Sequence, residues 1–507
     1  MLFNSYSFIF LFLPISFFYF FLISKSNIKN LNLLFLILIS FLFYSFWNKI
    51  YVFLLLGSIC GNFIFAKTII AFNDNNKIKI KKIIFVIGVS LNVLLLGYFK
   101  YFNFFIENIN LLFESSFAYK NIILPLAISF FTVQQINFLI EIYFNKNKDF
   151  KFLKYFLFVS FFPQLVAGPI VTYSDLIPQF EKDKLVNIRS NIILGLIIFT
   201  IGLFKKVVLA DSIGFYADEL FKIKDFEQNL NFIDVFIGSL AFTFQIYFDF
   251  SGYSDMAIGL ARIFSIKLPI NFKSPYKSKN IILYWKAWHI TFTSFITTKI
   301  YLPLNLFFTK KIINITKNKF TINCIGIFLP MAFAFLVSGF WHGASWNFIL
   351  WGLAHGILLI INHSFVILKG NKNFIPKTQI MKIIAMIYDN YFKVFFTFIV
   401  INLVNILFRS EKFEQSLFLY KSFFNFSPLI GIYQNYSFIF IFILILFVIV
   451  WFLPNNQELI KQIEKKLNKK YLNILSFKFI YLFIFLLMFI MSLLFMKSSP
   501  EFIYFQF

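Results

Sequence analysis

The stretch YSFIFIFILILFVIVWFL, residues 436–453, contains no charged side chain. A helix needs about 20 mainly apolar residues to cross the hydrocarbon core of a bilayer, and this run approaches that length. Similar uncharged runs occupy residues 31–47, 83–99 and 479–496. Of the 507 residues, 60% are hydrophobic and 14% are charged, whereas a soluble protein has about 25% charged residues. The sequence therefore predicts an all-α, polytopic membrane protein.

The apolar runs predict about 11–13 membrane-embedded segments. Between residues 155 and 360 these segments are shorter and are broken by Pro and Gly, as in FFPQLVAGPI, residues 161–170. Non-helical backbone at membrane depth is tolerated only where protein or a water-filled cavity satisfies its polar groups. We therefore expect re-entrant pieces and a central cavity in this region. A single membrane domain is predicted over residues 1–507, with peripheral C-terminal helices over about 380–507.

The chain has a formal net charge of +25. In a soluble protein such a charge would indicate nucleic acid as a partner. Here the lysines cluster in short loops between apolar runs, as at residues 73–82 and 145–154, and retention of these loops on the cytoplasmic side explains them. The lipid bilayer is therefore the expected partner, and nucleic acid is not. Cys60 and Cys324 have no spacing typical of a disulfide framework or a metal site.

Ionisable residues interrupt the apolar segment YFDFSGYSDMAIGLARIFSIKLP, residues 247–269. Burying a charge at the centre of a bilayer costs about 2.5–3.5 kcal/mol or more, so such residues indicate function or a buried network. Asp255 and Arg262 are seven residues apart, so they share one face of a straight helix and could pair. The alternative to a functional role is a buried network that holds helices together.

Two of the four histidines, His342 and His355, lie in SGFWHGASWNFILWGLAHG, residues 338–356. On a straight helix they would be about 140° apart, so a shared metal ion is not expected and no metal site is predicted. Imidazole can transfer protons at neutral pH, and a low-dielectric pocket favours its neutral, proton-accepting form. The residues alone leave three roles open for His342, namely a catalytic base, a proton relay and a structural histidine.

A third histidine, His289, lies in YWKAWHITFTSF, residues 284–295, which joins a basic loop to an apolar run. We expect it near a membrane boundary, where Trp285 and Trp288 are typical of an aromatic belt. Taken alone, His289 is as compatible with an interfacial hydrogen bond as with catalysis.

Together, the stretches at residues 247–269, 271–295 and 338–356 resemble the membrane-bound O-acyltransferases, in particular the bacterial branch that acetylates polysaccharides. Supporting matches include LLLGYFKYFNFF and GLFKKVVLADSI. The resemblance extends from residue 1 to about 365, with the core motifs at about 90–365, and beyond that only the hydropathy matches. It implies a ring of transmembrane and re-entrant helices around a central tunnel.

The resemblance also implies roles for two histidines. His342, in the sequence W-H-G, matches the family's hallmark histidine, regarded as the catalytic base. His289, in W-H-I, matches the second family position, where a His, Asn or Asp lies across the reaction chamber. The chain departs from the family pattern at Ala287, where an Arg is common, and at Thr297 and Thr298, where Arg-Asp is common.

The family resemblance implies a multi-pass enzyme of the bacterial inner membrane that takes acetyl from a cytoplasmic thioester, expected to be acetyl-CoA, with no bound cofactor. Lys273, Lys277 and Lys279 are candidates for binding the phosphates of the donor, although ordinary retention of a basic loop also explains them. A periplasmic partner of the GDSL/SGNH type would then place the acetyl group on a cell-wall glycan, expected to be peptidoglycan.

Other functions fit parts of the same pattern. An alginate-like exopolysaccharide could be the acceptor instead of peptidoglycan, and D-alanyl transfer to teichoic acids is a further acyl-transfer alternative. Broken helices and buried charges are also typical of transporters, so a non-catalytic transporter of an activated group or of a lipid-linked sugar is a different class of function. A catalytically inactive scaffold of an acetylation complex is the last alternative.

Overall fold

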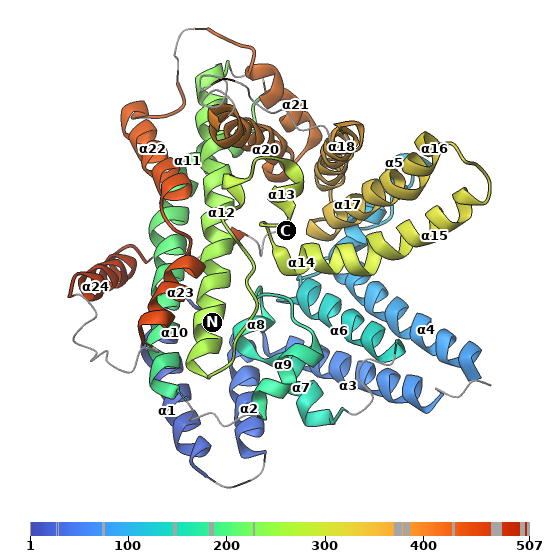
Figure 1. Ribbon diagram of the computed structural model, residues 1–507, viewed down its shortest axis with the longest axis vertical. Coiled ribbons are helices and arrows are strands. Elements are labelled where there is room, and N and C mark those ends of the chain that lie inside the picture. Colours follow the sequence, from blue (N-terminus) through green and yellow to red (C-terminus); the bar gives the residue numbers. More distant parts are fainter. Residues whose placement is uncertain are drawn as a thin grey trace. The chain divides into compact units, whose positions relative to one another are not determined.

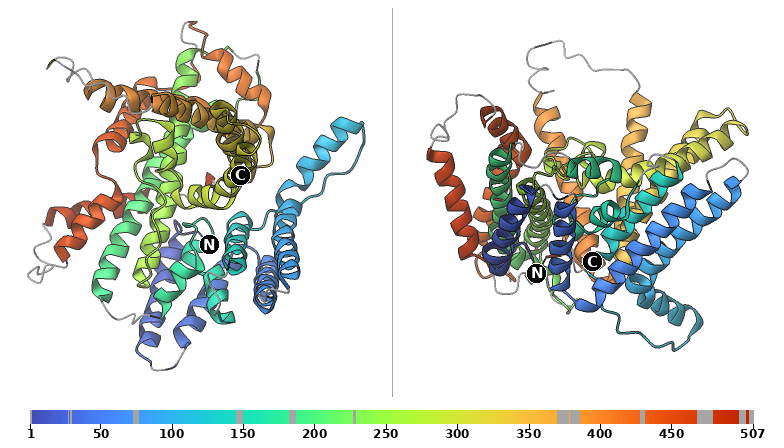
Figure 2. Two further views of the ribbon diagram at one scale, coloured as in Figure 1. Left: turned by 45° about the vertical axis from the view of Figure 1, so that its right-hand side comes forward. Right: turned by 90° about the horizontal axis from the view of Figure 1, so that it is seen from below.

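The structure is a computed structural model in which the regular elements of the described residues are all helices (Figures 1 and 2). It describes residues 2–26, 28, 30–72, 77–144, 150–181, 187–226, 229–369, 378, 386–427, 431–467, 479–496 and 502–503. Parts of the basic loops at 73–82 and 145–154 and of the predicted C-terminal helices at 380–507 therefore lie outside the described residues. The prediction of an all-α protein is confirmed.

The helices form two compact units. The first comprises Met1–Val207, Gly252–Ile270 and Glu458–Gln506, and the second comprises Val208–Ser251 and Asn271–Gln457. The long helix α12 (Phe232–Ile263) contributes to both. Nothing in this division tests the prediction of one membrane domain, which stays a prediction.

The remaining helices of the first unit are α1 (Leu13–Ser24), α2 (Leu31–Ser45), α3 (Lys49–Ala71), α4 (Ile78–Leu96), α5 (Phe102–Phe113), α6 (Ile128–Tyr143), α7 (Phe152–Ser160), α8 (Phe162–Leu165), α9 (Tyr173–Phe180), α10 (Ile188–Phe204), α23 (Asn456–Leu467) and α24 (Phe479–Leu494). Those of the second are α11 (Asp211–Phe221), α13 (Ile281–Trp285), α14 (Ile290–Ile296), α15 (Leu302–Ile313), α16 (Lys319–Asn323), α17 (Leu329–His342), α18 (Trp346–Lys369), α20 (Lys393–Arg409), α21 (Phe413–Ser422) and α22 (Tyr436–Phe452). In the first unit α3, α4 and α6 pack side by side, and they are the blue to teal group in Figure 2.

Seven helical segments among the described residues are long and apolar enough to cross a membrane, or eight if the bent pair α22 and α23 counts as one span. The seven are Lys49–Ala71, Ile78–Phe113, Ile188–Phe221, Phe232–Ile263, Lys319–His342, Trp346–Leu368 and Tyr388–Arg409. Shorter apolar helices lie at Phe8–Ser24, Leu31–Ser45 and Leu482–Leu494. The multi-pass membrane protein is thus confirmed, while the ring of about 11–13 segments and its central tunnel stay predictions.

Two pairs of glycines bring the backbones of α10 and α12 into contact in the first unit. A Cβ added to Gly202 would lie 2.6 Å from the carbonyl oxygen of Gly252, and one added to Gly195 would lie 2.7 Å from that of Gly259. Since lipid tails are as apolar as leucine, helices in membranes associate through such close packing rather than through hydrophobic burial. The seven-residue spacing within each helix repeats the contact two turns later.

The charged residues of the 247–269 segment pair with neighbouring helices and not with each other. Asp255 accepts a hydrogen bond from Lys205 Nζ at 2.7 Å, and Arg262 Nη2 donates to Glu464 Oε1 at 2.7 Å. The expected pairing of Asp255 with Arg262 is therefore wrong. Seven residues separate the two Cα atoms by about 10 Å along a helix, whereas the other helices bring an opposite charge into direct contact.

In the second unit, glycines also set the packing of α17 on α18. A Cβ added to Gly352 would lie 2.3 Å from the carbonyl oxygen of Phe335 and 3.0 Å from the Cα of Gly339. A Cβ added to Gly339 would lie 2.2 Å from the carbonyl oxygen of Phe348. The two backbones are therefore in contact at this crossing, and neither glycine can be replaced without moving a helix.

We expect Gly352→Ala to lower the unfolding temperature of the detergent-purified protein, because the methyl group would push α17 away from α18. Gly61→Ala is the matched control, since nothing lies within 4 Å of a Cβ added to Gly61, which is inside α3. That substitution removes the helix-propensity cost of glycine, about 1 kcal/mol, and should raise the unfolding temperature. Equal shifts of the same sign in both variants would contradict the proposed helix contact.

Candidate active site

The chain reverses direction directly after His342. This residue ends α17, residues 343–345 form the turn, and Trp346 begins α18. A Cβ added to Gly343 would lie 2.1 Å from the ring of Phe348, so a side chain cannot be accommodated there. The W-H-G sequence thus folds as a tight turn between two packed helices.

Aromatic rings surround His342, which is 5% exposed. Its imidazole centroid lies 5.1 Å from the rings of Trp341 and Trp351 and 5.2 Å from the ring of Phe408, which comes from α20. Both Trp351 and Phe408 meet the imidazole at steep angles, 89° and 71°. The ring is therefore held by edge-to-face contacts with aromatic side chains.

His355 and His342 contact the same indole, although a straight helix would separate them. The angle of about 140° holds only for a straight helix, and the turn at residues 343–345 breaks the helix between them. As a result one indole, that of Trp351, contacts both imidazoles, with centroid distances of 5.1 Å to His342 and 4.8 Å to His355. Among the described residues, no three His, Cys, Asp or Glu side chains are grouped so as to hold a metal ion.

His289 precedes α14 and has the left-handed backbone conformation, with φ of 41°. Its side chain is 1% exposed, and Nδ1 lies 3.0 Å from Oδ1 of Asn271. The same atom accepts from the backbone nitrogen of Thr291 at 3.4 Å and from Thr291 Oγ1 at 2.9 Å, and since a backbone N–H can only donate, this atom is the amide oxygen. Since this oxygen can only accept, His289 Nδ1 must donate. The neutral ring then carries its lone pair on Nε2.

Burial sets the charge of His289. It lowers the pKa of the imidazole from its ordinary value of 6.5 to about 3. The nearest rings are those of Phe250 at 4.7 Å and Phe292 at 5.1 Å, both apolar. His289 is therefore a neutral hydrogen-bonding group throughout the physiological pH range.

One phenyl ring links the two predicted catalytic histidines. Phe292, on α14, lies 5.1 Å from the ring of His289 and 5.9 Å from that of His342. It also stacks on Trp341 at 4.1 Å. The structure thus brings together two histidines that are 53 residues apart in the sequence (342 less 289). No local pattern in the sequence marks Phe292, Asn271 or Phe408 as part of this site.

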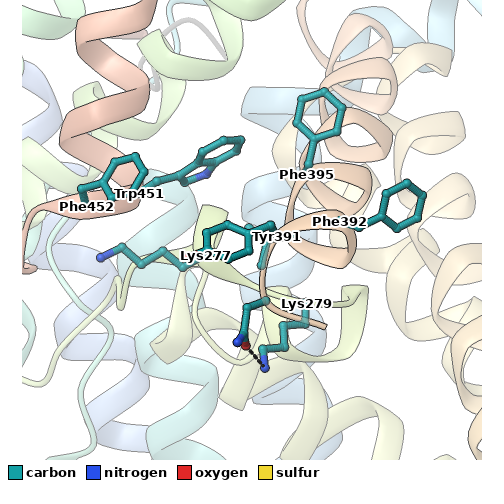
Figure 3. Close-up of a pocket in the computed structure, with 9 residues that line it drawn as sticks. Lys277, Lys279, Tyr391, Phe392, Phe395, Trp451 and Phe452 are labelled. Carbon is teal, nitrogen blue, oxygen red and sulfur yellow. Dashed lines mark hydrogen bonds between the residues drawn. The ribbon is translucent and has the colours of Figure 1, made fainter. Parts of the chain in front are cut away.

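Two of the three candidate donor-binding lysines line one cavity of the second unit, with a volume of about 440 Å³. Lys277 and Lys279 form part of its wall, and aromatic side chains form much of the rest (Figure 3). The other lining residues are Asn390, Tyr391, Phe392, Val394, Phe395, Trp451 and Phe452. Lys273 is exposed and is not among them.

The two cavity lysines retain hydrogen-bonding capacity. Lys277 Nζ donates to the carbonyl oxygen of Leu453 at 2.9 Å. Lys279 Nζ donates to Asp389 at 2.7 Å and to Asn390 at 2.9 Å, the latter drawn in Figure 3. An ammonium group has three donors, so each lysine keeps at least one for an anionic group. Aromatic walls beside two cations are suited to a phosphorylated ligand with a planar or apolar part.

The family model described as "MBOAT, membrane-bound O-acyltransferase family" matches residues 114–408 of the chain. This range contains His289 and His342, both glycines of the α17–α18 crossing, and Phe408. Among curated relatives, a peptidoglycan O-acetyltransferase from Helicobacter pylori is 42% identical over 405 residues, which cover 75% of this chain and 71% of the relative.

Relatives with other acceptors are less similar. A probable alginate O-acetylase from Pseudomonas putida is 30% identical over 398 residues, covering 76% of this chain and 73% of the relative. A teichoic acid D-alanyltransferase from Streptococcus thermophilus is 27% identical over 246 residues, covering 48% of this chain and 57% of the relative. The similarity to acetyl-transferring relatives thus extends over more of the chain.

The buried His289 should make folding stability depend on pH. An unfolded histidine has a pKa of about 6.5, so acid protonates the unfolded chain before it protonates the folded one. The stability gained from the neutral ring is present in full above about pH 6.5 and is lost as the pH falls towards 3. Relative to His289→Asn, the wild type should lose up to about 1.4 kcal/mol more per pH unit between pH 6 and 4.

Unfolding in detergent at several pH values measures this difference. Asn is chosen because it tolerates the left-handed conformation and does not titrate. Parallel curves for the two proteins between pH 6 and 4 would mean that His289 is not held neutral by burial.

Proposed function

This chain belongs to the membrane-bound O-acyltransferase family, and from that premise we propose that it is an acetyltransferase of the bacterial inner membrane. It takes acetyl from a cytoplasmic thioester and delivers it for O-acetylation of peptidoglycan. The observation that carries the proposal is the placement of His342 and His289 against one ring, that of Phe292, within the matched region. Two buried imidazoles in one aromatic site are suited to moving a proton away from water.

The identity of the final acceptor rests on the relatives. The relative named for peptidoglycan is 42% identical to this chain, against 30% for the alginate relative over a similar length. The relative named for D-alanyl transfer is 27% identical over 48% of the chain. These values favour acetyl over D-alanyl transfer, and peptidoglycan over alginate.

In the proposed reaction, His342 acts as the general base. Its ring takes the proton from an acceptor hydroxyl while the oxygen attacks the carbonyl carbon of the acetyl thioester. The carbon–sulfur bond breaks, the thiolate leaves, and the proton held on His342 passes to the sulfur. The attacking hydroxyl has one hydrogen, which it donates to His342, so His289, with its lone pair on Nε2, would accept a hydrogen bond from another donor such as a second hydroxyl of the acceptor or a water molecule. The products are an acetyl ester and a free thiol.

The donor is proposed to be acetyl-CoA. Lys277 and Lys279, at the cavity of the second unit, would bind its phosphates, and the exposed Lys273 is a third candidate. The aromatic wall formed by Trp451, Tyr391 and neighbouring rings would accommodate the adenine, because a base stacks readily on an aromatic side chain. No bound cofactor is required for this transfer.

The last step needs a second protein. We propose a partner of the GDSL/SGNH type on the periplasmic side, which receives the acetyl group and places it on the glycan. The glycan itself is the final acceptor of the pathway and not the group that attacks the thioester.

The double substitution Lys277→Ala and Lys279→Ala should raise the KM for acetyl-CoA about tenfold, because two charge-assisted contacts to phosphate are lost. The kcat should change little, since these contacts are equally strong in the ground and transition states. Rates of acetyl release from acetyl-CoA by purified protein give both constants. Lys310→Ala, which removes an exposed lysine elsewhere in the second unit, is the control and should keep the wild-type KM. A KM unchanged in the double variant places the donor elsewhere.

The decisive test compares His342→Ala with His363→Ala in cells whose own gene is deleted. His363 lies on α18 and has no ring contact to the site, so it is a matched control for the loss of an imidazole. Removing a general base should reduce base-released acetate per muropeptide by about 100-fold or more, while His363→Ala keeps normal acetylation. His289→Ala should also lose acetylation.

Membrane levels of each variant are measured in the same cells. If His342→Ala accumulates normally and acetylation persists, the acyl-transfer mechanism through His342 is wrong, and the transporter alternative gains support. If acetate is absent from peptidoglycan already in the wild type, the acceptor is another glycan.

A further inference from the structure

A second cluster with polar atoms adjoins His342 through Trp351. It consists of His355, Trp285 and Trp351, which are 0%, 5% and 4% exposed. The three rings are in mutual contact, with centroid distances of 5.0 Å for Trp285–His355, 4.8 Å for Trp351–His355 and 5.8 Å for Trp285–Trp351. The cluster is therefore one compact group, assembled from α13 and α18, which pack together in the second unit (Figure 1).

Four nitrogen atoms of this cluster have no hydrogen-bond partner among the described residues. They are Nδ1 and Nε2 of His355 and Nε1 of each indole. A buried donor or acceptor without a partner costs about 1–3 kcal/mol, and native proteins leave few such groups. The cost is higher on a membrane-spanning helix such as α18, where a polar residue is by default a sign of function.

Local structure holds the cluster in place. Asn280 caps α13, its Oδ1 accepting from the backbone nitrogen of Leu283 at 2.9 Å, and α13, which ends at Trp285, packs on α18. Tyr284 stacks on His355 at 6.2 Å and 10°, and Phe335 of α17 contacts Trp285 at 4.9 Å. The rings that carry the four nitrogens are therefore held by packing against neighbouring side chains.

The chemistry of the nitrogens defines what they can bind. Each indole offers one N–H donor, and a neutral imidazole offers one donor and one acceptor. A hydroxyl oxygen could accept from both indole N–H groups and donate to the acceptor nitrogen of the imidazole, and the second imidazole nitrogen, on another side of the ring, would need a separate partner. A carbonyl or a phosphate could only accept, and would leave the imidazole acceptor unsatisfied.

We propose that His355, Trp285 and Trp351 form a binding site for a hydroxyl oxygen. Trp351 also contacts His342, so the site adjoins the proposed general base, and its role in the reaction rests on the function proposed above. The oxygen belongs either to a second hydroxyl of the acceptor alcohol, other than the one that attacks the thioester, or to a water molecule in the path of the proton. The two sources share one chemistry and differ in their kinetics.

The test uses the full-length variant His355→Phe. Its unfolding temperature is measured on detergent-purified protein, and its acetyl transfer is measured in cells. Phenyl preserves the ring contacts and removes both nitrogens. If nothing binds there, loss of two unsatisfied atoms should leave activity unchanged and raise the unfolding temperature; this result would overturn the proposal. If a hydroxyl is bound, the variant should fold and its acetyl transfer in cells should fall about tenfold or more. His363→Phe, on the same helix, should match the wild type.

Hydrolysis of acetyl-CoA without any added acceptor separates the two sources. If the oxygen is that of water, His355→Phe lowers hydrolysis and transfer to the same extent. If it is that of the acceptor alcohol, transfer falls while hydrolysis is kept. Both outcomes support the site, and full retention of both activities overturns it.

Trp285→Phe provides an independent variant, since it removes a single N–H. It should lower acetyl transfer several-fold. If His355→Phe does not accumulate, acetyl transfer and acetyl-CoA hydrolysis by Trp285→Phe test the hydroxyl site instead. His342→Ala is measured in parallel. Activity that survives in His342→Ala means that the proposed function fails, whereas loss in His342→Ala with full activity in His355→Phe and Trp285→Phe means that only the hydroxyl site fails.

Discussion

The contact between Gly339 and Gly352 is the constraint on which the candidate site depends. It brings the backbones of α17 and α18 together just before α17 ends at His342. Since the chain then reverses within three residues, Trp351 on the returning helix contacts both His342 and His355. A bulkier pair at this crossing would separate the helices, and the indole could no longer contact both imidazoles. The two glycines thus fix the position of Trp351 relative to both histidines.

Glycine contacts also bring α10 and α12 together in the first unit, where Gly202 meets Gly252 and Gly195 meets Gly259. Close backbones leave little room for water, so charged residues beside them must find partners within the protein. Lys205 with Asp255 and Arg262 with Glu464 provide these partners. This explains why ionisable residues occur in an otherwise apolar stretch without belonging to the candidate active site.

The sequence was sufficient for the fold class, because apolar runs are local patterns, and its W-H-G and W-H-I motifs singled out the two histidines that the structure places against Phe292; their catalytic role stays a prediction. It was not sufficient for the partners of those histidines. Asn271 and Phe408 lie 18 and 66 residues from His289 and His342, and nothing local marks such contacts. The turn at residues 343–345 was also not predicted. A straight helix would place His342 and His355 about 140° apart, whereas in the structure both contact Trp351. Pairing of Asp255 failed for the same reason, since its partner comes from another helix.

The two predicted catalytic histidines occupy opposite kinds of helix end. His342 is the last residue of α17, and His289 immediately precedes the first residue of α14. The carbonyl groups at the end of a helix carry a partial negative charge, and the amide groups at its start carry a partial positive charge. The end of α17 therefore places partial negative charge beside His342, whereas the start of α14 places partial positive charge beside His289. Two chemically identical side chains thus experience opposite backbone fields, because the chain runs in opposite senses past them.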